Sequence, residues 1–395
     1  MSGVLGTGGL SIAMVGTRGA PAHYGGFETA VEEVGARLAA RGHRVRVYCR
    51  TGNAERMSRY RGMDLVTLPA LRMRTLETLS HTALSAVHLA LRRMDAAFVF
   101  NAANAPFLPV LRAARIPVAT HVDGLEWKRA KWGKGGKAYY RAAETAAVRM
   151  SDALIADAEG ISSYYDAEYG VPTELISYGA PILTDVPSTG LAPLGLRPGG
   201  FHLVVARFEP ENHVDVIVEG YVRSGARLPL VVVGSAPYAD EYVARVRDIA
   251  GDDPRVHLLG GVWDQGLLDQ LYAHALTYLH GHSVGGTNPS LLRAIGAGTA
   301  TISWDVQFNR EVTREEGRYF GSAADIAPLL LDAEVRPDRA LQRGERLRER
   351  ARAYDWDRVA DGYEDLARRL ARGAVGGPHP RARRLQARQA VRGAV

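Results

Sequence analysis

The sequence predicts an α/β protein built from two doubly wound, Rossmann-like domains. Short apolar runs alternate with helical patterns along most of the 395 residues, which is typical of parallel βαβ units. A chain of this length is too long for one hydrophobic core. The Pro- and Gly-rich stretch 186–200 has no periodicity and separates two such series. We therefore expect domains over 1–185 and 201–354, joined by this linker and facing each other across a cleft.

The strands of the N-terminal domain are expected where short apolar runs are followed by glycine or polar residues. Helical patterns lie between these runs, and the clearest cover 26–41 and 77–93. The expected strands are 10–16, 44–49, 64–69, 96–101, 117–122, 152–157 and 173–178.

The C-terminal domain is expected to begin directly after the linker. Two charged helical stretches, 338–353 and 357–372, follow its last strand. Residues 373–395 are rich in Gly, Pro and Ala and contain five arginines but no acidic residue. This tail is therefore expected to be disordered. The expected strands are 201–206, 229–234, 256–259, 276–280 and 299–304.

Composition and charge limit the functional classes. A hydrophobic content of 46% and a charged content of 23% are those of a soluble globular protein. No apolar run approaches the ~18–20 residues that span a bilayer, and the N-terminus lacks a signal-peptide pattern. The single cysteine, Cys49, cannot form an internal disulfide, which favours a cytoplasmic location.

Basic residues are concentrated in the N-terminal half. Residues 44–141 hold 18 Lys and Arg against 6 Asp and Glu. Within them, basic and aromatic residues alternate over 128–141, a pattern suited to an anionic bilayer face or a lipid diphosphate. The alternative is a solvated loop. No nucleic-acid partner is expected, because no recognition fold surrounds the basic residues.

The segment 281–298 is the most informative stretch of the chain. It follows the expected strand 276–280 and passes through Gly285 and Gly286 into an apolar helix whose N-cap is Thr287 or Asn288. Glycines beside an exposed helix N-terminus form a site for an anion such as phosphate. The alternative is an ordinary connection between a strand and a helix.

Three other polar segments follow expected strands. The loop 16–29 contains Gly25 and Gly26 and is longer than a dinucleotide-binding fingerprint. Arg207 begins a second segment, and a guanidinium there is suited to a diphosphate. His121 begins a third. The remaining polar candidates in these segments and in 281–298 are Asp123, Glu126, Glu209, Glu211, Asn212 and, more weakly, His23 and His282.

No motif demands a metal or a bound cofactor. The sequence has no His-Glu-x-x-His pattern and no Cys/His cluster. A P-loop and a Gly-x-Ser-x-Gly elbow are also missing.

The chain resembles retaining glycosyltransferases of family 4, which have the GT-B architecture, and more narrowly a bacterial rhamnosyltransferase-like subgroup with a distinctive N-terminal domain. The resemblance covers residues 10 to about 371 and rests on the segments 16–29, 122–129, 206–212 and 282–292. It implies a donor nucleotide on the C-terminal domain, an acceptor on the N-terminal domain, and a last helix, 357–371, that packs back onto the N-terminal domain.

The resemblance also implies roles for individual residues. Arg207 would hold the donor diphosphate, while His121 and Asp123 would position the sugar and the acceptor. No metal or cofactor is implied, because the nucleotide sugar is a co-substrate. The residues expected to bind substrate are Gly25, Gly26, Glu126, Glu209, Asn212, His282, Gly285, Gly286, Thr287, Asn288, Ser290 and Arg293.

The expected reaction is transfer of a hexosyl unit, with rhamnose favoured, from a nucleoside diphosphate sugar to a growing cell-surface or exopolysaccharide glycan, with retention. The donor would be dTDP-rhamnose. The acceptor would be lipid-linked or an oligosaccharide, and the enzyme would work in the cytoplasm or peripherally at the inner face of the plasma membrane.

This chain departs from the family pattern at four positions. Asn212 stands where family 4 usually has lysine, and His121 stands where the subgroup has asparagine. The family's two glutamates fall on Gly285 and Arg293, and an arginine cannot accept the hydrogen bonds that a donor ribose would give to glutamate. Arg293 would add charge near the diphosphate or impair donor binding. The alternative is therefore a GT-B protein that binds nucleotide sugars without efficient turnover.

Overall fold

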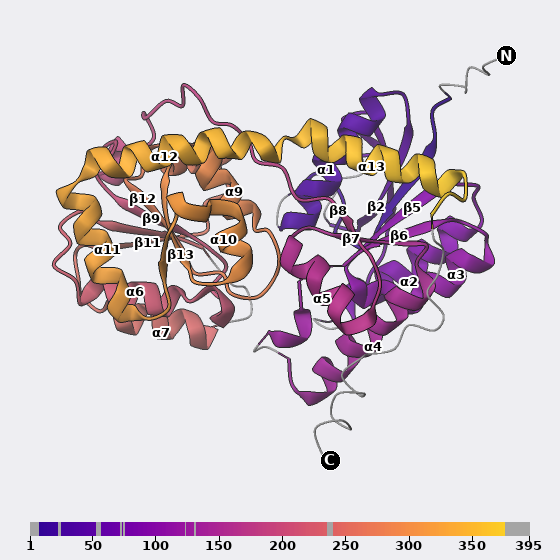
Figure 1. Cartoon of the computed structure of the whole chain (residues 1–395), viewed down its shortest axis with the longest axis horizontal. Helices are drawn as coiled ribbons and strands as arrows, with labels where there is room; N and C mark the ends of the chain where they lie inside the picture. The colour runs from indigo at the N-terminus through magenta and orange to yellow at the C-terminus, as the bar shows by residue number, and fades with distance from the viewer. Residues whose placement is uncertain are drawn as a thin grey trace. The chain divides into compact units, whose positions relative to one another are not determined.

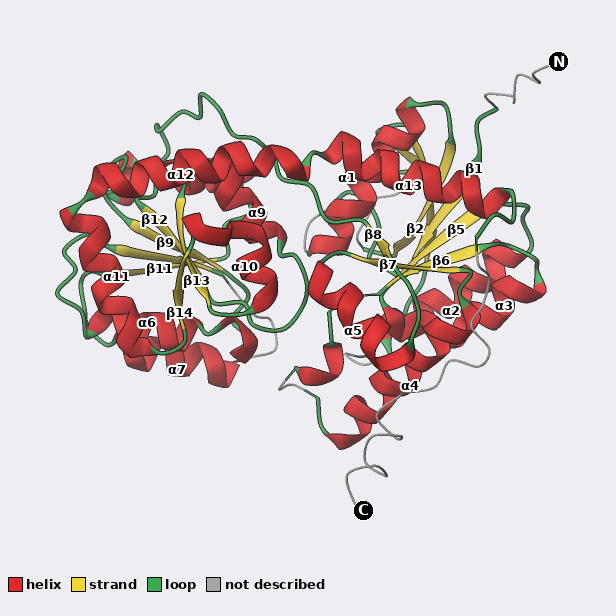
Figure 2. Ribbon diagram, viewed as in Figure 1, coloured by secondary structure: helices red, strands yellow, loops and turns green. Residues whose placement is uncertain are grey.

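The chain forms two compact units, and the two parallel sheets of the computed structural model confirm the predicted fold class (Figures 1 and 2). The structure describes residues 8–22, 25–52, 57–71, 73, 76–122, 124–129, 132–234 and 240–375. The first unit runs to Lys128, continues over Trp132–Ser177 and ends with the segment from Trp356. The second unit contains Arg129 and Tyr178–Asp355.

The first unit is built on an eight-stranded sheet with the order β3-β4-β2-β1-β5-β6-β7-β8. Every pairing is parallel except that of β3 with β4. Because β1 lies between β2 and β5, the connections reverse direction beside β1, where doubly wound sheets bind ligands. The strands are β1 (Ser11–Val15), β2 (Arg44–Arg50), β3 (Arg59–Tyr60), β4 (Met63–Leu68), β5 (Ala96–Phe100), β6 (Val118–His121), β7 (Ala153–Ala156) and β8 (Glu174–Leu175).

Helices cover both faces of this sheet, which explains why its central strands are almost entirely apolar. α1 and α13 lie on one face, and α2, α3 and α4 lie on the other (Figure 2). The helices are α1 (Gly26–Ala40), α2 (Glu77–Ala90), α3 (Leu108–Ala113), α4 (Lys134–Met150), α5 (Glu159–Tyr169) and α13 (Trp356–Ala371), with 3₁₀ turns η1 (Ala102–Phe107) and η2 (Glu126–Lys128).

The second unit is built on a six-stranded, fully parallel sheet with the order β11-β10-β9-β12-β13-β14. Its first strand, β9, pairs with β10 on one side and with β12 on the other, so the order reverses between β9 and β12. The strands are β9 (His202–Val205), β10 (Leu230–Val233), β11 (Val256–Gly260), β12 (Thr277–His280), β13 (Ala300–Trp304) and β14 (Arg318–Phe320).

The helices of the second unit also form two layers. α6, α7 and α11 pack over a core that includes Ile217, Tyr221 and Leu330, whereas α9 and α12 cover the opposite face (Figure 1). The helices are α6 (Val214–Val222), α7 (Asp240–Ala250), α8 (Gln265–His274), α9 (Pro289–Gly296), α10 (Gln307–Thr313), α11 (Ala323–Val335) and α12 (Pro337–Ala351); the 3₁₀ turns are η3 (Ala192–Leu194), η4 (Pro210–Asn212), η5 (Arg314–Glu316) and η6 (Arg352–Tyr354).

The segment 186–200, which we expected to be a linker, is packed within the second unit. Leu191 and Leu196 are buried, and the backbone amide of Gly190 donates to Oε1 of Gln270 at 2.7 Å. A Pro- and Gly-rich composition excludes regular structure, but it does not prevent isolated leucines from finding a core. The N-terminal part of the first unit runs to Ser177, before the expected boundary at 185.

The two C-terminal helices belong to different units. α12 is part of the second unit, while α13 packs on α1 and β5 of the first unit. The Tyr363 ring of α13 lies 4.9 Å from Phe98 and 6.4 Å from Phe100, measured between ring centroids. This apolar stripe secures α13 to the sheet. The tail 373–395 was expected to be disordered. Its residues from 376 onward lie outside the described part of the chain.

Candidate functional site

Two loops of the second unit meet at its topological switch point. The first loop follows β9 and contains Arg207 and Asn212, and the second follows β12 and contains His282 and Gly285. Because β9 and β12 pair in parallel, with Thr277 opposite His202, their carboxyl ends lie side by side. A crevice of this kind is where open α/β sheets bind ligands.

Asn212 joins the two loops. Its Nδ2 donates to the backbone oxygen of Arg207 at 2.8 Å, and its Oδ1 lies 2.9 Å from Nδ1 of His282. A carbonyl only accepts hydrogen bonds, so this arrangement fixes the orientation of the amide. Oδ1 must then accept from His282, which places the ring proton on Nδ1. Asn212 thus orients two other residues of the site.

Close backbone contact completes the junction. A Cβ on Gly281 would lie 2.0 Å from the backbone oxygen of Asn212, so only glycine fits there. Ser283 donates from its backbone amide (2.9 Å) and from its hydroxyl (3.1 Å) to the backbone oxygen of Glu211. Gly285 has φ +154°, and a Cβ there would lie 2.6 Å from Nε2 of His282. The two glycines therefore allow the loops to pack against each other.

Arginine and glutamate side chains form a series of ion pairs at the first loop. Nη1 of Arg129 lies 3.4 Å from Oε1 of Glu211 and 3.5 Å from Oε2 of Glu209. Oε2 of Glu209 also lies 3.8 Å from Nη2 of Arg207. The Arg129 side chain is buried, whereas that of Arg207 is 38% exposed. Arg207 is thus guided by Glu209 and still accessible to an anionic ligand.

Arg129 is a site residue that the sequence did not predict. It precedes the C-terminal domain by many residues, and it stood out only as part of the basic stretch 128–141. Its place in the resemblance segment 122–129 was the available indication.

The second loop ends at the N-terminus of α9. Of the two possible N-caps, the structure has Asn288, whose Oδ1 accepts from the backbone amide of Ser290 at 2.9 Å. Oγ of Ser290 lies 2.8 Å from the Tyr272 hydroxyl. Gly286 and Thr287 are buried in the turn before the cap. The positive end of this helix dipole is therefore presented at the same strand edge as Arg207.

His282 of this loop and His280, the last residue of β12, are uncharged at neutral pH. Burial lowers the pKa of His282 well below its usual value, and the nearby positive charges of Arg129 and Arg207 lower it further. Burial alone lowers the pKa of His280 to about 3. With its proton on Nδ1, His282 offers Nε2 only as an acceptor.

Arg293 faces a neighbouring helix. Its guanidinium forms an ion pair with the Asp269 carboxylate of α8, and both side chains are mostly buried. Gln265 also donates to Asp269 at 2.9 Å. Arg293 therefore has a local counter-charge, and its effect on a donor diphosphate stays a prediction.

His121 lies at the end of β6 in the first unit, in an aromatic enclosure. Its Nδ1 lies 2.9 Å from the Tyr363 hydroxyl, and its ring contacts Phe27 and Phe100 at 5.1 and 5.6 Å between centroids. Burial lowers the pKa of His121 to about 3, so the ring is neutral. His121 can therefore take part in hydrogen bonding but carries no charge.

The other predicted residues of the first unit lie near this ring or on the following turn. Gly25 is the N-cap of α1 and Gly26 its first residue, directly before Phe27. Glu126 lies in η2 and accepts from Nε1 of Trp132 at 3.2 Å. Asp123 and His23 lie outside the described residues.

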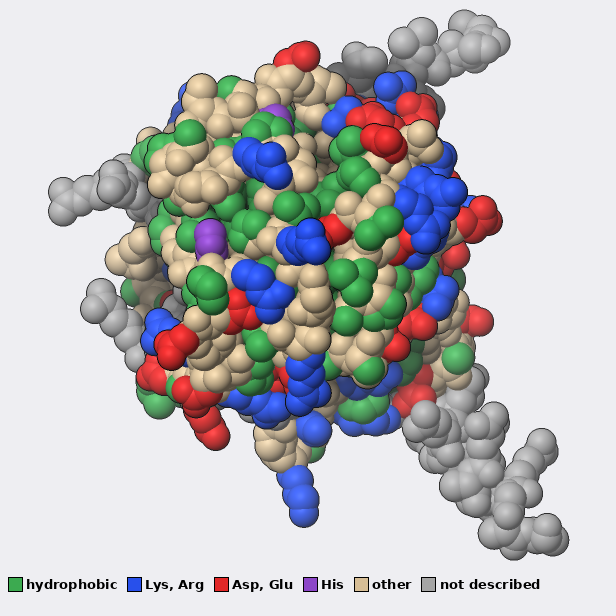
Figure 3. Space-filling model, turned by 90° about the vertical axis from the view of Figure 1, so that its left-hand side faces the viewer, with side chains coloured by type: hydrophobic (Ala, Val, Ile, Leu, Met, Phe, Trp, Pro, Cys, Tyr) green, Lys and Arg blue, Asp and Glu red, His purple; other side chains and the backbone are tan. Residues whose placement is uncertain are grey.

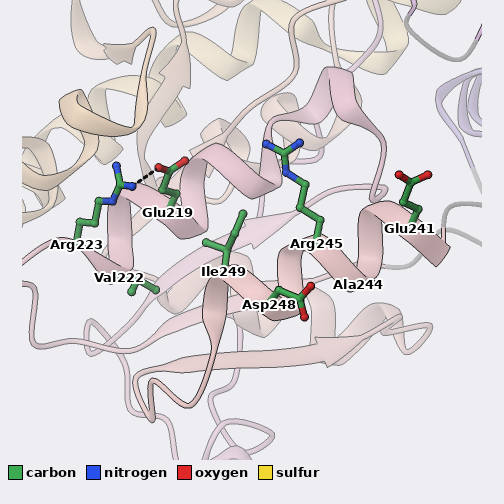
Figure 4. A pocket seen from close by; sticks show the side chains of 8 residues that line it. All are labelled: Glu219, Val222, Arg223, Glu241, Ala244, Arg245, Asp248 and Ile249. Carbon is green, nitrogen blue, oxygen red and sulfur yellow. Dashed lines mark ion pairs between the residues drawn. The ribbon is translucent and has the colours of Figure 1, made fainter.

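A groove of about 730 Å³ between α6 and α7 is a poor candidate for the site (Figure 4). Three of its charged side chains take part in surface ion pairs, Arg223 with Glu219 at 2.7 Å and Arg245 with Asp215 at 3.2 Å. No strand-end residue contributes to it, because its lining lies on α6 and α7 or directly after α6: Glu219, Val222, Arg223, Glu241, Ala244, Arg245, Asp248 and Ile249.

Among the described residues, no group of three or more His, Cys, Asp or Glu side chains is arranged to hold a metal ion. In the same part of the chain, no helix combines the length and the apolar character needed to cross a bilayer.

Comparisons by sequence reach only part of the chain. A family model described as "Domain of unknown function (DUF1972)" matches residues 10–181. The GtfA subunit of the UDP-N-acetylglucosamine–peptide N-acetylglucosaminyltransferase of Streptococcus gordonii is 27% identical over 119 residues. That alignment covers 29% of this chain and 22% of the streptococcal protein.

Comparisons by structure cover nearly the whole chain and agree with the GT-B fold. Sucrose-phosphate synthase of Thermosynechococcus elongatus has a TM-score of 0.78 at 20% identity over 91% of this chain and 99% of its own. HepE of Anabaena, solved with UDP-glucose, has a TM-score of 0.73 at 14% identity over 91% and 100%. Trehalose-phosphate synthase of Burkholderia vietnamiensis has a TM-score of 0.65 at 13% identity over 91% and 99%.

Proposed function

We propose that the chain is a glycosyltransferase that transfers a hexosyl unit from a nucleoside diphosphate sugar. The observation that carries this proposal is the position of Arg207 and of the capped N-terminus of α9 at the carboxyl ends of two paired strands of the second sheet, where the Ser290 hydroxyl donates to the backbone oxygen of Val205 at 3.4 Å. Both are suited to a diphosphate. The similarity to solved sugar-transferring enzymes, among them one bound to UDP-glucose, supports the same function.

Catalysis would be electrostatic. The breaking sugar–phosphate bond leaves negative charge on the diphosphate, and Arg207 with the α9 amides would stabilise this charge in place of a metal ion. Asn212 would fix the positions of Arg207 and His282 relative to each other through its two hydrogen bonds. Neutral His121 would act as a hydrogen-bonding partner that positions the sugar or acceptor, together with Asp123. The anomeric configuration would be retained, as in the family that the sequence resembles.

The donor we favour is dTDP-rhamnose. A glutamate at position 293 would accept from ribose hydroxyls, but this chain has an arginine there that pairs with Asp269. A thymidine donor has no 2′-hydroxyl and loses less from this change than a uridine or guanosine donor. The preference for rhamnose rests on the resemblance alone.

The acceptor we favour is a growing cell-surface glycan that is lipid-linked or an oligosaccharide, used in the cytoplasm or at the inner face of the plasma membrane. Residues 44–141 contain 18 basic and 6 acidic residues, and this positive charge supports an anionic partner. In the basic–aromatic stretch, Lys134 and Lys137 are exposed, whereas Tyr139 donates its hydroxyl to the backbone oxygen of Ala103 at 2.7 Å.

Arg207→Ala tests this proposal most simply. Loss of a charge-assisted contact to the diphosphate is expected to lower kcat/KM for sugar transfer by about 10- to 150-fold (about 1.5–3 kcal/mol). Arg223→Ala is the matched control, because Arg223 is exposed directly after α6 of the same unit and pairs only with Glu219 of that helix among the contacts described. Wild-type transfer by Arg207→Ala would contradict the proposal.

Arg293 motivates a second candidate, a protein of the same fold that binds nucleotide sugars with little turnover. Calorimetric titration with dTDP-, UDP- and GDP-sugars, followed by product analysis, separates the two. Binding without hydrolysis or transfer would favour this second candidate.

A further inference from the structure

Helix α2 of the first unit exposes two large apolar side chains and buries several polar ones. The residues it buries against the sheet include His81, Thr82 and Ser85, together with Ala86 and Leu89. Two of its leucine and valine side chains point outward instead, Leu84 at 45% and Val87 at 55% exposure. A surface helix of a globular protein normally shows the reverse arrangement.

The exposed side chains form one stripe. Leu76, Leu84, Val87 and Leu91 follow helical spacing, and Leu91 is 80% exposed. Met57, Leu71 and Met73, in the segments before the helix, are also exposed. Seven of the thirteen exposed large hydrophobic residues described in the whole chain therefore lie within 57–91. A concentration of this kind marks an interaction surface.

Charge at the C-terminal end of this stripe is net positive, with two exposed arginines and one exposed acid, Asp95. Arg92 and Arg93 are exposed and directly follow Leu91. Glu77 is the one acid of α2. Its Oε2 lies 4.0 Å from Nη2 of Arg18 and 3.5 Å from Nη1 of Arg50. The helix therefore presents apolar side chains flanked by arginines, with its carboxylate already neutralised. Such a face complements an anionic bilayer better than a protein groove of mixed charge.

The stripe begins beside the strand ends of the first sheet. Arg50 is the last residue of β2 and donates from Nη2 to the Thr78 hydroxyl at 2.8 Å. The backbone amide of Arg50 donates to the backbone oxygen of Arg18, in the glycine-rich loop after β1. A membrane along α2 would therefore lie next to the edge where a doubly wound sheet binds its ligand.

We propose that the outward face of α2, the stripe Leu76–Leu84–Val87–Leu91 with Arg92 and Arg93, docks the protein on an anionic bilayer. Membrane docking itself does not depend on sugar transfer. Its consequence does rest on the proposed function: an acceptor held in that bilayer is lipid-linked, and its head group enters the first unit beside Arg18 and Arg50.

Vesicle sedimentation of the full chain tests this surface without any activity measurement. With vesicles of phosphatidylcholine containing 30% phosphatidylglycerol in low salt, the triple variant Leu84→Gln, Val87→Gln, Leu91→Gln is expected to bind at least about tenfold more weakly than the wild type. Glutamine keeps helix propensity at these exposed positions. Arg92→Ser with Arg93→Ser is expected to weaken binding to these vesicles and reduce its salt dependence.

A matched control lies on the second unit. Leu331, Val335 and Leu341 are exposed at 39%, 75% and 52% on α11 and α12, and the corresponding triple glutamine variant is expected to bind as the wild type does. On the face of the second unit shown in Figure 3, acidic and basic side chains are interspersed. Directly after α2, the exposed arginines Arg92 and Arg93 outnumber the exposed acid Asp95.

A fluorescent label gives an independent measurement. Cys49 is buried, which raises the pKa of its thiol to about 11, so an introduced cysteine is labelled selectively. Leu91→Cys carrying an environment-sensitive dye is expected to shift to the blue on anionic vesicles, whereas labelled Leu341→Cys is not.

Three outcomes would overturn the proposal. The first is wild-type vesicle binding by the α2 triple variant. The second is loss of binding in Lys134→Ser with Lys137→Ser while the α2 variants still bind. The third is a wild-type dimer in light scattering that the α2 triple variant converts to a monomer, with no vesicle binding by either protein. The third outcome would assign the face to a second copy of the chain.

Discussion

Single residues in the candidate site act mainly through their partners. Asn212 is the clearest example: the sequence suggested a substrate-binding residue, and the structure shows both ends of its amide engaged by Arg207 and His282. Hydrogen-bond partners separated by 70 residues in sequence cannot be identified from local pattern. Arg129 was missed for the same reason, because its acid partners lie 80 and 82 residues further along the chain.

Arg293 provides a prediction at the level of one residue. Arg293→Glu with Asp269→Asn places a carboxylate at 293 without a facing negative charge on α8. If the ribose of the donor lies there, affinity for UDP-sugars relative to dTDP-sugars is expected to rise about 5- to 150-fold, the value of one buried hydrogen-bond partner (about 1–3 kcal/mol).

Competition titrations of the double variant and of Asp269→Asn alone measure this ratio. The single variant serves as the control for the loss of the ion pair. An unchanged ratio in the double variant would place the ribose elsewhere.

Secondary-structure elements were largely predictable, because strands in a doubly wound sheet are continuous apolar runs and helices are periodic. The strand before each candidate loop lies close to its expected range. The linker was harder, since no pattern distinguishes a packed irregular segment from a flexible one. The outward apolar face of α2 was also invisible from sequence, because periodicity shows that a helix has two faces but does not show which face is buried.

Helix α13 provides a prediction at the level of elements. Tyr363→Phe keeps the ring against Phe98 but removes the hydroxyl that pairs with Nδ1 of His121. Loss of this buried hydrogen bond is expected to lower the free energy of unfolding of the first unit by about 1–3 kcal/mol.

Denaturant unfolding followed by circular dichroism measures this change. Tyr60→Phe is the control, because the Tyr60 hydroxyl bonds to Glu32 at the partly exposed edge of the same unit. Equal losses in the two variants would show that the hydroxyl of Tyr363 has no special role.

The whole molecule carries buried histidines in both units, and they link its stability to pH. The pKa values of His121 and His280 fall to about 3, that of His81 to about 4, and that of His282 well below its usual value, each chiefly through burial. Unfolding returns these rings to water, where they bind a proton near pH 6.5.

The unfolded chain therefore holds more protons than the folded one below pH 6.5, so the histidine contribution to stability is complete above that pH and is lost as the pH falls toward 4. Burial raises the pKa of Glu144 to about 7, so the folded chain holds this proton at a pH where the unfolded chain has released it. The Glu144 contribution to stability therefore increases as the pH falls from 7 toward 5. We expect the melting temperature to fall between pH 7 and pH 5, and to fall less in His81→Gln. Identical pH profiles for the wild type and His81→Gln would contradict this account.

The central claim is that a nucleoside diphosphate binds at the switch point of the second sheet. Hydrogen–deuterium exchange of the full chain with and without saturating dTDP tests it most directly, because it locates the ligand without requiring the acceptor. We predict slower exchange of backbone amides in 206–213 and 281–292, with the loop after β1 unchanged, and loss of this protection in Arg207→Ala. Protection confined to the first unit, or to the groove between α6 and α7, would contradict the claim.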